Sequence, residues 1–250
     1  MTYITRFMKN VSHQSENAQP EGQSQRPPAP GGFGTERIAA FSDGVFAIAI
    51  TLLILDLPVP GPEMLHGDPG TELNPYLLNL WPKYLTYVLS FVIVGIYWVG
   101  HHNTFFYIKR CDRILLWLNI LFLLFIVFIP FPTALLGQYW DLQLPAIFYA
   151  STLIATGLSI QLLWWYATHN HRLVAKDIDP NLVRRARRRN LTGPVICLAA
   201  IAVSFLNVYI SLFFFILVPI FYISPGRIDQ HWMQNLHREI ENLENKEHLG

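Results

Sequence analysis

Ionisable and amide side chains inside apolar segments are the residues of this sequence whose chemistry most needs an explanation. Asp43, His102 and Asn119 each lie six to eight residues from a basic residue that flanks the same segment. A helical rise of about 1.5 Å per residue places all three about 9–12 Å inward from that flank. Such groups are costly in hydrocarbon and persist there only with a partner or water. We predict one interhelical hydrogen-bonded network of Ser42, Asp43, His101, His102 and Asn119.

Other roles for these polar residues stay open from the sequence alone. Each group can instead cap its own helix or extend to the membrane surface. Asp43, His101 and His102 would form a proton relay if the chain were a proton- or cation-coupled secondary transporter. A metal site is not expected, because adjacent helical residues point about 100° apart and the two histidines cannot reach one ion together. The sequence has no GxSxG, phosphate-loop, HExxH or CxxC motif, so we expect neither an enzyme nor a cofactor.

The first apolar segment carries a stripe of large aliphatic residues. Ile48, Leu52 and Leu55 are spaced i, i+4, i+7 and therefore share one face of a helix, with the hydroxyl of Thr51 beside them. On a single helix such a stripe is typical of contact with lipid or with another helix. Asp56 follows the stripe, and with the acidic loop after it would concentrate cations at that end.

Five apolar runs must position these residues. The chain is 52% hydrophobic and only 14% charged, whereas soluble domains have about 25% charged residues. The runs cover residues 41–57, 84–106, 114–136, 144–167 and 191–223. The last is about 50 Å long as a helix, and one crossing needs only about 20 residues. We predict that it turns near 207–211, which gives an all-α integral membrane protein with six transmembrane helices.

Charge placement predicts the orientation. With six spans and a cytoplasmic N-terminus, the basic linkers at 109–113 and 172–189 and the C-terminal basic residues all lie inside. The arginine cluster is then a positive-inside determinant, with binding of anionic lipid headgroups as the alternative, and we expect no nucleic acid partner. The cluster comprises Arg184, Arg185, Arg187, Arg188 and Arg189.

The predicted organisation has three parts. Residues 1–35 are rich in Pro, Gly, Ser, Gln and Asn, and we expect a disordered cytosolic tail. Residues 36–224 form the six-helix membrane domain. Residues 225–250 place apolar residues at helical spacing between charges, which predicts an amphipathic cytosolic helix. Whether that helix packs on its own copies or lies on the membrane surface stays open.

One long string resembles a known family. Arg37-x-x-x-Phe41-Ser42-Asp43 followed by GVFAIAITLLILDL is similar to the first helix of the lysosomal/endosomal potassium channel family (transmembrane protein 175 type), in its prokaryotic branch. The similarity continues through WVGHHNTF at 98–105 and through 118–137, and covers about half of the chain.

The resemblance implies a six-helix subunit with one copy of the repeat, four of which form a homotetramer in a prokaryotic plasma membrane. The first helices would line a pore for K⁺, without a TVGYG filter, and the sequence contains no TVGYG. By position, Ile48 would be the narrowest constriction, Leu52 and Leu55 the further apolar layers, and Thr51 a contributor to selectivity. Arg37, Ser42 and Asp43 would belong to the family's interhelical polar network.

Overall fold

The structure is a computed structural model, and it describes residues 34–61 and 69–223. Those residues are almost entirely helical, as predicted. The longer helices are α2 (Thr35–Leu52), α3 (Pro69–Asn79), α4 (Trp81–Tyr107), α5 (Arg113–Phe128), α6 (Pro130–Gln138), α7 (Gln143–Thr168), α8 (Pro180–Ser204) and α9 (Val208–Ile223). Two short 3₁₀ helices are η1 (Leu53–Asp56) and η3 (His169–His171). The predicted C-terminal helix and all but the last two residues of the predicted tail lie outside the described residues.

The described helices agree with most of the predicted spans. Thr35–Asp56, Trp81–Tyr107, Arg113–Gln138 and Gln143–His171 are each long and apolar enough to cross a membrane. The third of these bends where Pro130 begins α6 directly after α5. The last apolar run is divided between α8 and the shorter apolar α9, with the turn at 205–207, slightly before the predicted position. Asn207 caps α9, because its side-chain oxygen accepts a hydrogen bond from the Tyr209 N–H at 2.8 Å.

Two predicted linkers are wrong in part. The acidic loop after the first span was predicted to continue to the second span, but residues 69–79 form α3, with Pro69 and Glu72 in its first turn, where proline and a carboxylate suit a helix. The arginine cluster was predicted to lie in a linker, but it belongs to α8. Asp179 caps that helix through the Asn181 N–H at 2.8 Å, and Pro180 occupies its first position.

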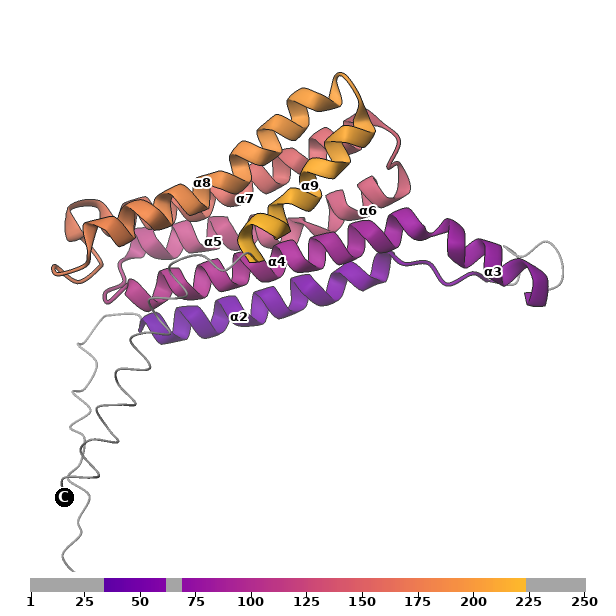
Figure 1. Cartoon of the computed structure of the whole chain (residues 1–250). Coiled ribbons are helices and arrows are strands. Elements are labelled where there is room, and N and C mark those ends of the chain that lie inside the picture. The colour runs from indigo at the N-terminus through magenta and orange to yellow at the C-terminus, as the bar shows by residue number, and fades with distance from the viewer. Residues whose placement is uncertain (1–33, 62–68, 224–250) are drawn as a thin grey trace, which may run out of the picture. The chain divides into compact units, whose positions relative to one another are not determined.

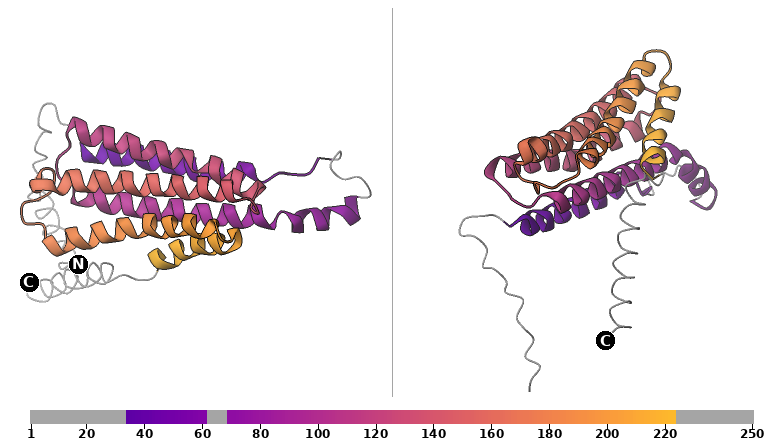
Figure 2. Two further views of the ribbon diagram at one scale, coloured as in Figure 1. Left: turned by 90° about the horizontal axis from the view of Figure 1, so that it is seen from above. Right: turned by 60° about the vertical axis from the view of Figure 1, so that its left-hand side comes forward.

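The helices pack so that α2 and α8 lie on opposite sides of the bundle. Helix α2 contacts α4 and α5, α5 contacts α7, and α7 contacts α8, which also contacts α9. Figure 1 shows this order from α2 to α8, and the right-hand view of Figure 2 agrees with it. The central core is formed by Phe46, Phe122, Tyr149 and Phe215, each no more than 1% exposed.

The contact between α7 and α8 is unusually close. A Cβ placed on Gly157 would lie 2.6 Å from Cγ and 3.0 Å from Cδ of Pro194. Small residues let helices approach in membranes, where dispersion contacts rather than the hydrophobic effect hold them together. The absent side chain of Gly157 therefore sets the distance between the two helices.

A second interhelical contact joins the middle of α8 to the C-terminal end of α9. The Tyr222 hydroxyl donates to the Arg189 carbonyl oxygen at 2.6 Å and accepts from the Gly193 N–H at 3.3 Å. In a regular helix the Gly193 N–H pairs directly with the Arg189 carbonyl. Pro194 interrupts the hydrogen-bond ladder one residue later. The hydroxyl therefore supports α8 at the point where its own hydrogen bonding is weakest.

Tyr222→Phe is expected to destabilise the protein by about 1 kcal/mol, because it removes one partly buried hydroxyl that is hydrogen-bonded to α8 beside Pro194. Thermal unfolding in detergent, followed by tryptophan fluorescence, measures the effect as a lower Tm. Tyr209→Phe is the matched control, since Tyr209 is 59% exposed. Equal Tm values for the two variants would show that the hydroxyl of Tyr222 does not support α8.

Candidate ion pathway on the first helix

Helix α2 and η1 have one face that packs against the subunit and one that does not. The packed face is made of Ile38, Ser42, Phe46, Ala49 and Leu53, all buried at helical spacing. The other face presents the predicted stripe, with Ile48 59%, Leu52 39% and Leu55 76% exposed. The single chain therefore leaves these three large aliphatic residues uncovered.

Thr51 lies beside this stripe and is exposed as well. Its Oγ1 donates to the Ile48 carbonyl oxygen at 2.8 Å, which is a common bond for a threonine in a helix. Because the hydroxyl proton is used in this bond, the oxygen keeps lone pairs that can face water or a cation. The hydroxyl oxygen of Thr51 can therefore accept a hydrogen bond from water or contact a cation beside the stripe.

Three predicted network residues form one buried chain of hydrogen bonds. Asn119 Oδ1 lies 2.8 Å from His101 Nε2, and Asn119 Nδ2 donates to Ser42 Oγ at 3.0 Å. Ser42 Oγ donates onward to the Ile38 carbonyl oxygen at 2.8 Å. Since an amide oxygen only accepts, His101 Nε2 is the donor in the first bond. This chain ties α2, α5 and α4 together behind the exposed stripe.

Aromatic rings enclose the imidazole at one end of this chain. The ring of Phe122 is stacked parallel to that of His101 at 5.6 Å, and the Phe46 and Phe105 rings lie 5.7 Å and 4.5 Å away. His101 is 1% exposed. Asn119 Oδ1 is the polar partner of His101 Nε2 in these apolar surroundings. Without it, the unpaired N–H donor would lower the stability of the folded subunit.

The other predicted network residues do not join the buried chain. Asp43 is exposed, and its Oδ1 accepts a hydrogen bond from Trp98 Nε1 at 2.8 Å. His102 is exposed and its ring lies 6.1 Å from that of Trp98. Arg37 is also exposed. The predicted single layer is therefore divided into a buried trio and an exposed group, because His101 and His102 lie about 100° apart on α4.

Trp98 is a residue of this group that sequence reasoning missed. It lies four residues before His102, so the two share a face of α4. Indole N–H groups donate and cannot accept, and in an apolar segment they need an acceptor. That need is the one signal in the sequence that points from Trp98 to a neighbouring carboxylate such as Asp43.

Asn119→Leu is expected to destabilise the subunit by about 1–2 kcal/mol, the upper range for interhelical hydrogen bonds in membrane proteins. It leaves His101 without its amide acceptor and Ser42 without its donor. Asn103→Leu is the matched control, because Asn103 is exposed on α4. Thermal unfolding of both variants in detergent checks this prediction, and equal transitions for Asn119→Leu and the unmodified chain would contradict it.

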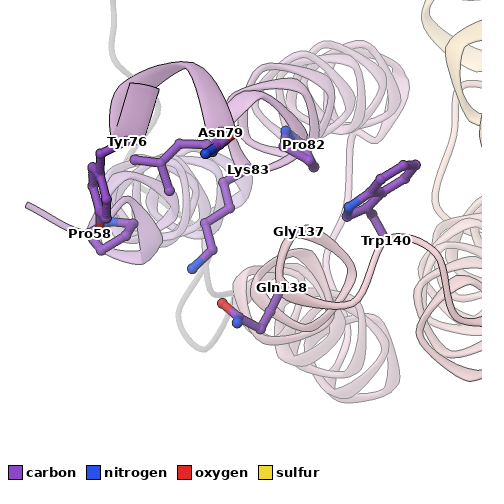
Figure 3. Close-up of a pocket in the computed structure, with 9 residues that line it drawn as sticks. Pro58, Tyr76, Asn79, Pro82, Lys83, Gly137, Gln138 and Trp140 are labelled. Atoms are coloured by element: carbon purple, nitrogen blue, oxygen red, sulfur yellow. The ribbon is translucent and has the colours of Figure 1, made fainter. Parts of the chain in front are cut away.

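A shallow hollow lies at the far end of α2, close to Asp56. It has a volume of about 400 Å³, and its lining includes Pro58, Tyr76, Lys83, Gln138 and Trp140. Figure 3 shows the Lys83 and Gln138 side chains directed towards one another across it. Asp56 is half-buried, and its carboxylate interacts electrostatically with Lys83. The acidic mouth predicted from the sequence therefore also contains a lysine ammonium group.

Comparisons with known proteins identify the family. The family model for the endosomal/lysosomal potassium channel TMEM175 matches residues 37–130. A potassium channel of Streptomyces collinus is 42% identical over 164 residues, which cover 63% of this chain and 76% of the relative. A potassium channel of Chamaesiphon minutus is 39% identical over 186 residues, which cover 73% of this chain and 90% of the relative.

A solved structure agrees with these sequence matches. The crystal structure of a lysosomal potassium-selective channel TMEM175 homolog from Chamaesiphon minutus superposes with a TM-score of 0.67 at 35% identity. The match covers 76% of this chain and 96% of that chain. Since the helices, the sequence and nearly the full length of the Chamaesiphon minutus relative all correspond, the chain belongs to the TMEM175 family.

Proposed function

We propose that the chain is one subunit of a homotetrameric, potassium-permeable cation channel whose pore is lined by α2. The observation that carries this proposal is the exposed stripe of Ile48, Leu52 and Leu55 on a helix whose other face packs against the subunit. The bacterial relatives are named potassium channels. Four copies arranged around one axis would cover four such stripes at once.

In the proposed pore the stripe acts as a hydrophobic gate. Rings of isoleucine and leucine exclude water from a narrow passage, so an ion must lose part of its hydration to pass. Thr51 would supply a ring of hydroxyl oxygens between the Ile48 and Leu52 levels. Asp56 would attract cations at the outer mouth, an effect that the nearby Lys83 ammonium group reduces.

The buried trio of Ser42, Asn119 and His101 would fix the rotation of α2 in the proposed channel. Rotation of α2 by one residue position, about 100°, would carry Ile48 away from the axis. The chain of bonds from Ser42 through Asn119 to His101 opposes such rotation, because it holds the opposite face of α2 against α5 and α4. We propose that it keeps the stripe directed at the pore.

The proposed topology has six crossings in the plasma membrane of a prokaryotic cell, with both termini cytoplasmic. Helices α8 and α9 would be the fifth and sixth crossings. The arginines at the beginning of α8, together with Lys109, Arg110 and Arg113 near the end of α4, support this orientation through the positive-inside rule.

The reversal potential tests the channel proposal. Purified full-length chain is reconstituted into planar bilayers with K⁺ on one side and Na⁺ on the other. We expect currents that reverse near the potassium Nernst potential. A reversal potential midway between the Nernst potentials of K⁺ and Na⁺ would indicate a cation channel without preference for potassium. Flux that requires a second gradient, from verified tetramers, would overturn the channel and favour the coupled transporter.

A further inference from the structure

The N-terminal half of α8 concentrates positive charge without a counter-charge. Arg184, Arg185, Arg187 and Arg188 are all exposed. Like charges three or four residues apart on a helix repel one another. Within residues 34–61 and 69–223, no carboxylate is paired with any of the four. This stretch of helix therefore lacks the anion that would neutralise it.

The fifth arginine of the cluster has a different environment. Arg189 is half-buried, and its Nη2 donates to the Tyr222 carbonyl oxygen at 3.4 Å. Its guanidinium also lies 5.6 Å from the centroid of the Tyr222 ring. Arg189 thus has partners within the subunit, and only the four exposed guanidinium groups are available to an external anion.

An exposed apolar strip continues from the arginines along the same face of α8. Val195 and Leu198 are 63% and 62% exposed, and Ala202 is exposed as well. With about 100° between successive residues, Arg184 lies within roughly 40° of all three strip residues. Arg185, its neighbour in sequence, lies about 100° away from that direction. Arg184, and not Arg185, is therefore aligned with the strip.

The order of these groups along the helix matches one leaflet of a bilayer. Seven residues, or about 10 Å of helix, separate Arg188 from Val195, and about 21 Å separate it from Ala202. Half of a hydrocarbon core is about 15 Å thick. A phosphate at the arginines would therefore place its acyl chains beside the strip. Helix α8 also lies on the opposite side of the bundle from α2, so it faces lipid if α2 lines the proposed pore.

We propose that this face of α8 is a binding site for one anionic phospholipid. Arg184 and Arg188 hold the headgroup phosphate, which guanidinium groups bind through paired N–H donors, and the acyl chains lie along Val195, Leu198 and Ala202. A nucleic acid or an acidic protein would satisfy the arginines and leave the strip uncovered. A phospholipid is the partner whose charge and apolar length match both parts.

Native mass spectrometry of the full-length chain in detergent tests the site. The protein is titrated with a phosphatidylglycerol and, separately, with a phosphatidylcholine of the same acyl chains. We expect preferential retention of phosphatidylglycerol. Each arginine near an anionic headgroup contributes about fivefold in affinity, so Arg184→Gln should weaken retention about fivefold and the double variant with Arg188→Gln about 25-fold. Arg185→Gln, which removes the same charge one residue away, should change it less than about twofold.

Three outcomes would overturn the proposal. Equal losses for Arg184→Gln and Arg185→Gln would mean diffuse attraction and not a site. Equal retention of phosphatidylglycerol and phosphatidylcholine would mean that the arginines do not select an anionic headgroup. Glycerophosphoglycerol has the same headgroup but no acyl chains. If it displaced phosphatidylglycerol at an equal concentration, the apolar strip would not contribute to binding. The assay measures bound lipid and not current, so its failure is distinct from failure of the proposed channel, and an unchanged elution volume in size-exclusion chromatography confirms that each variant is folded.

Discussion

Replacing Ile48 by alanine is expected to raise the current through the reconstituted channel by about tenfold. Four isoleucines at one level would form the narrowest apolar ring of the proposed pore, and each substitution removes three carbon atoms from it. A wider and less apolar ring holds water more readily, which lowers the dehydration cost of a passing ion. A reduction of the barrier by about 1.4 kcal/mol corresponds to a tenfold change in rate.

The control for this prediction lies on the same helical segment. Ile54 is 46% exposed, but it lies on η1, roughly 80–120° away from the direction of Ile48. Ile54→Ala should leave the current within about twofold of the unmodified channel. Single-channel recording in planar bilayers measures both variants. Unchanged permeation in Ile48→Ala, with tetramers verified by cross-linking, would mean that Ile48 does not line the pore.

Gly157→Ala is expected to destabilise the subunit by about 2–3 kcal/mol, because the added methyl group overpacks the contact between α7 and α8. The added Cβ would lie 2.6 Å from Cγ of Pro194, and that atom belongs to a ring which cannot rotate away. Helices α7 and α8 would have to separate. The contact of Tyr222 with Arg189 and Gly193, next to Pro194, would be disturbed as a consequence.

Gly100→Ala is the matched control, because it adds the same methyl group to α4. Its Cβ would meet only the Ile160 Cδ1, at the ordinary contact distance of 4.0 Å. Alanine is also the better helix former, by up to about 1 kcal/mol. The two substitutions should therefore shift the thermal transition in opposite directions. A Gly157→Ala protein as stable as Gly100→Ala would show that α7 and α8 adjust without cost.

The exposed stripe on α2 illustrates what was predictable. Ile48, Leu52 and Leu55 share a face because helical periodicity is a local property, and the same period places Ser42 on the opposite, packed face. Apolar runs long enough to cross a membrane are equally local, so the main helices were predicted close to their observed bounds. The start of α8 was also marked, by Asp179 and Pro180, but the charge of the residues that follow suggested a linker instead.

The division of the polar layer illustrates what was not predictable. Depth follows from residue number, and the hydrogen bond between His101 and Asn119 agrees with a shared level for these two residues. Which histidine turns inward depends on how α4 is rotated about its axis. That rotation is decided by packing against α2 and α5, where the Phe46 and Phe122 rings enclose His101.

By itself, the sequence of this protein determined the main apolar helices and which of their residues share a face, because rise and periodicity need only residue number. The tertiary structure decided which groups meet: Asn119 with His101 and Ser42, Trp98 with Asp43, and Gly157 with Pro194. These pairs come from different helices, and 18 to 77 residues separate the partners of each hydrogen-bonded pair. Their contact depends on helix rotation and spacing, which are set by the packing of the whole bundle and not by any local pattern.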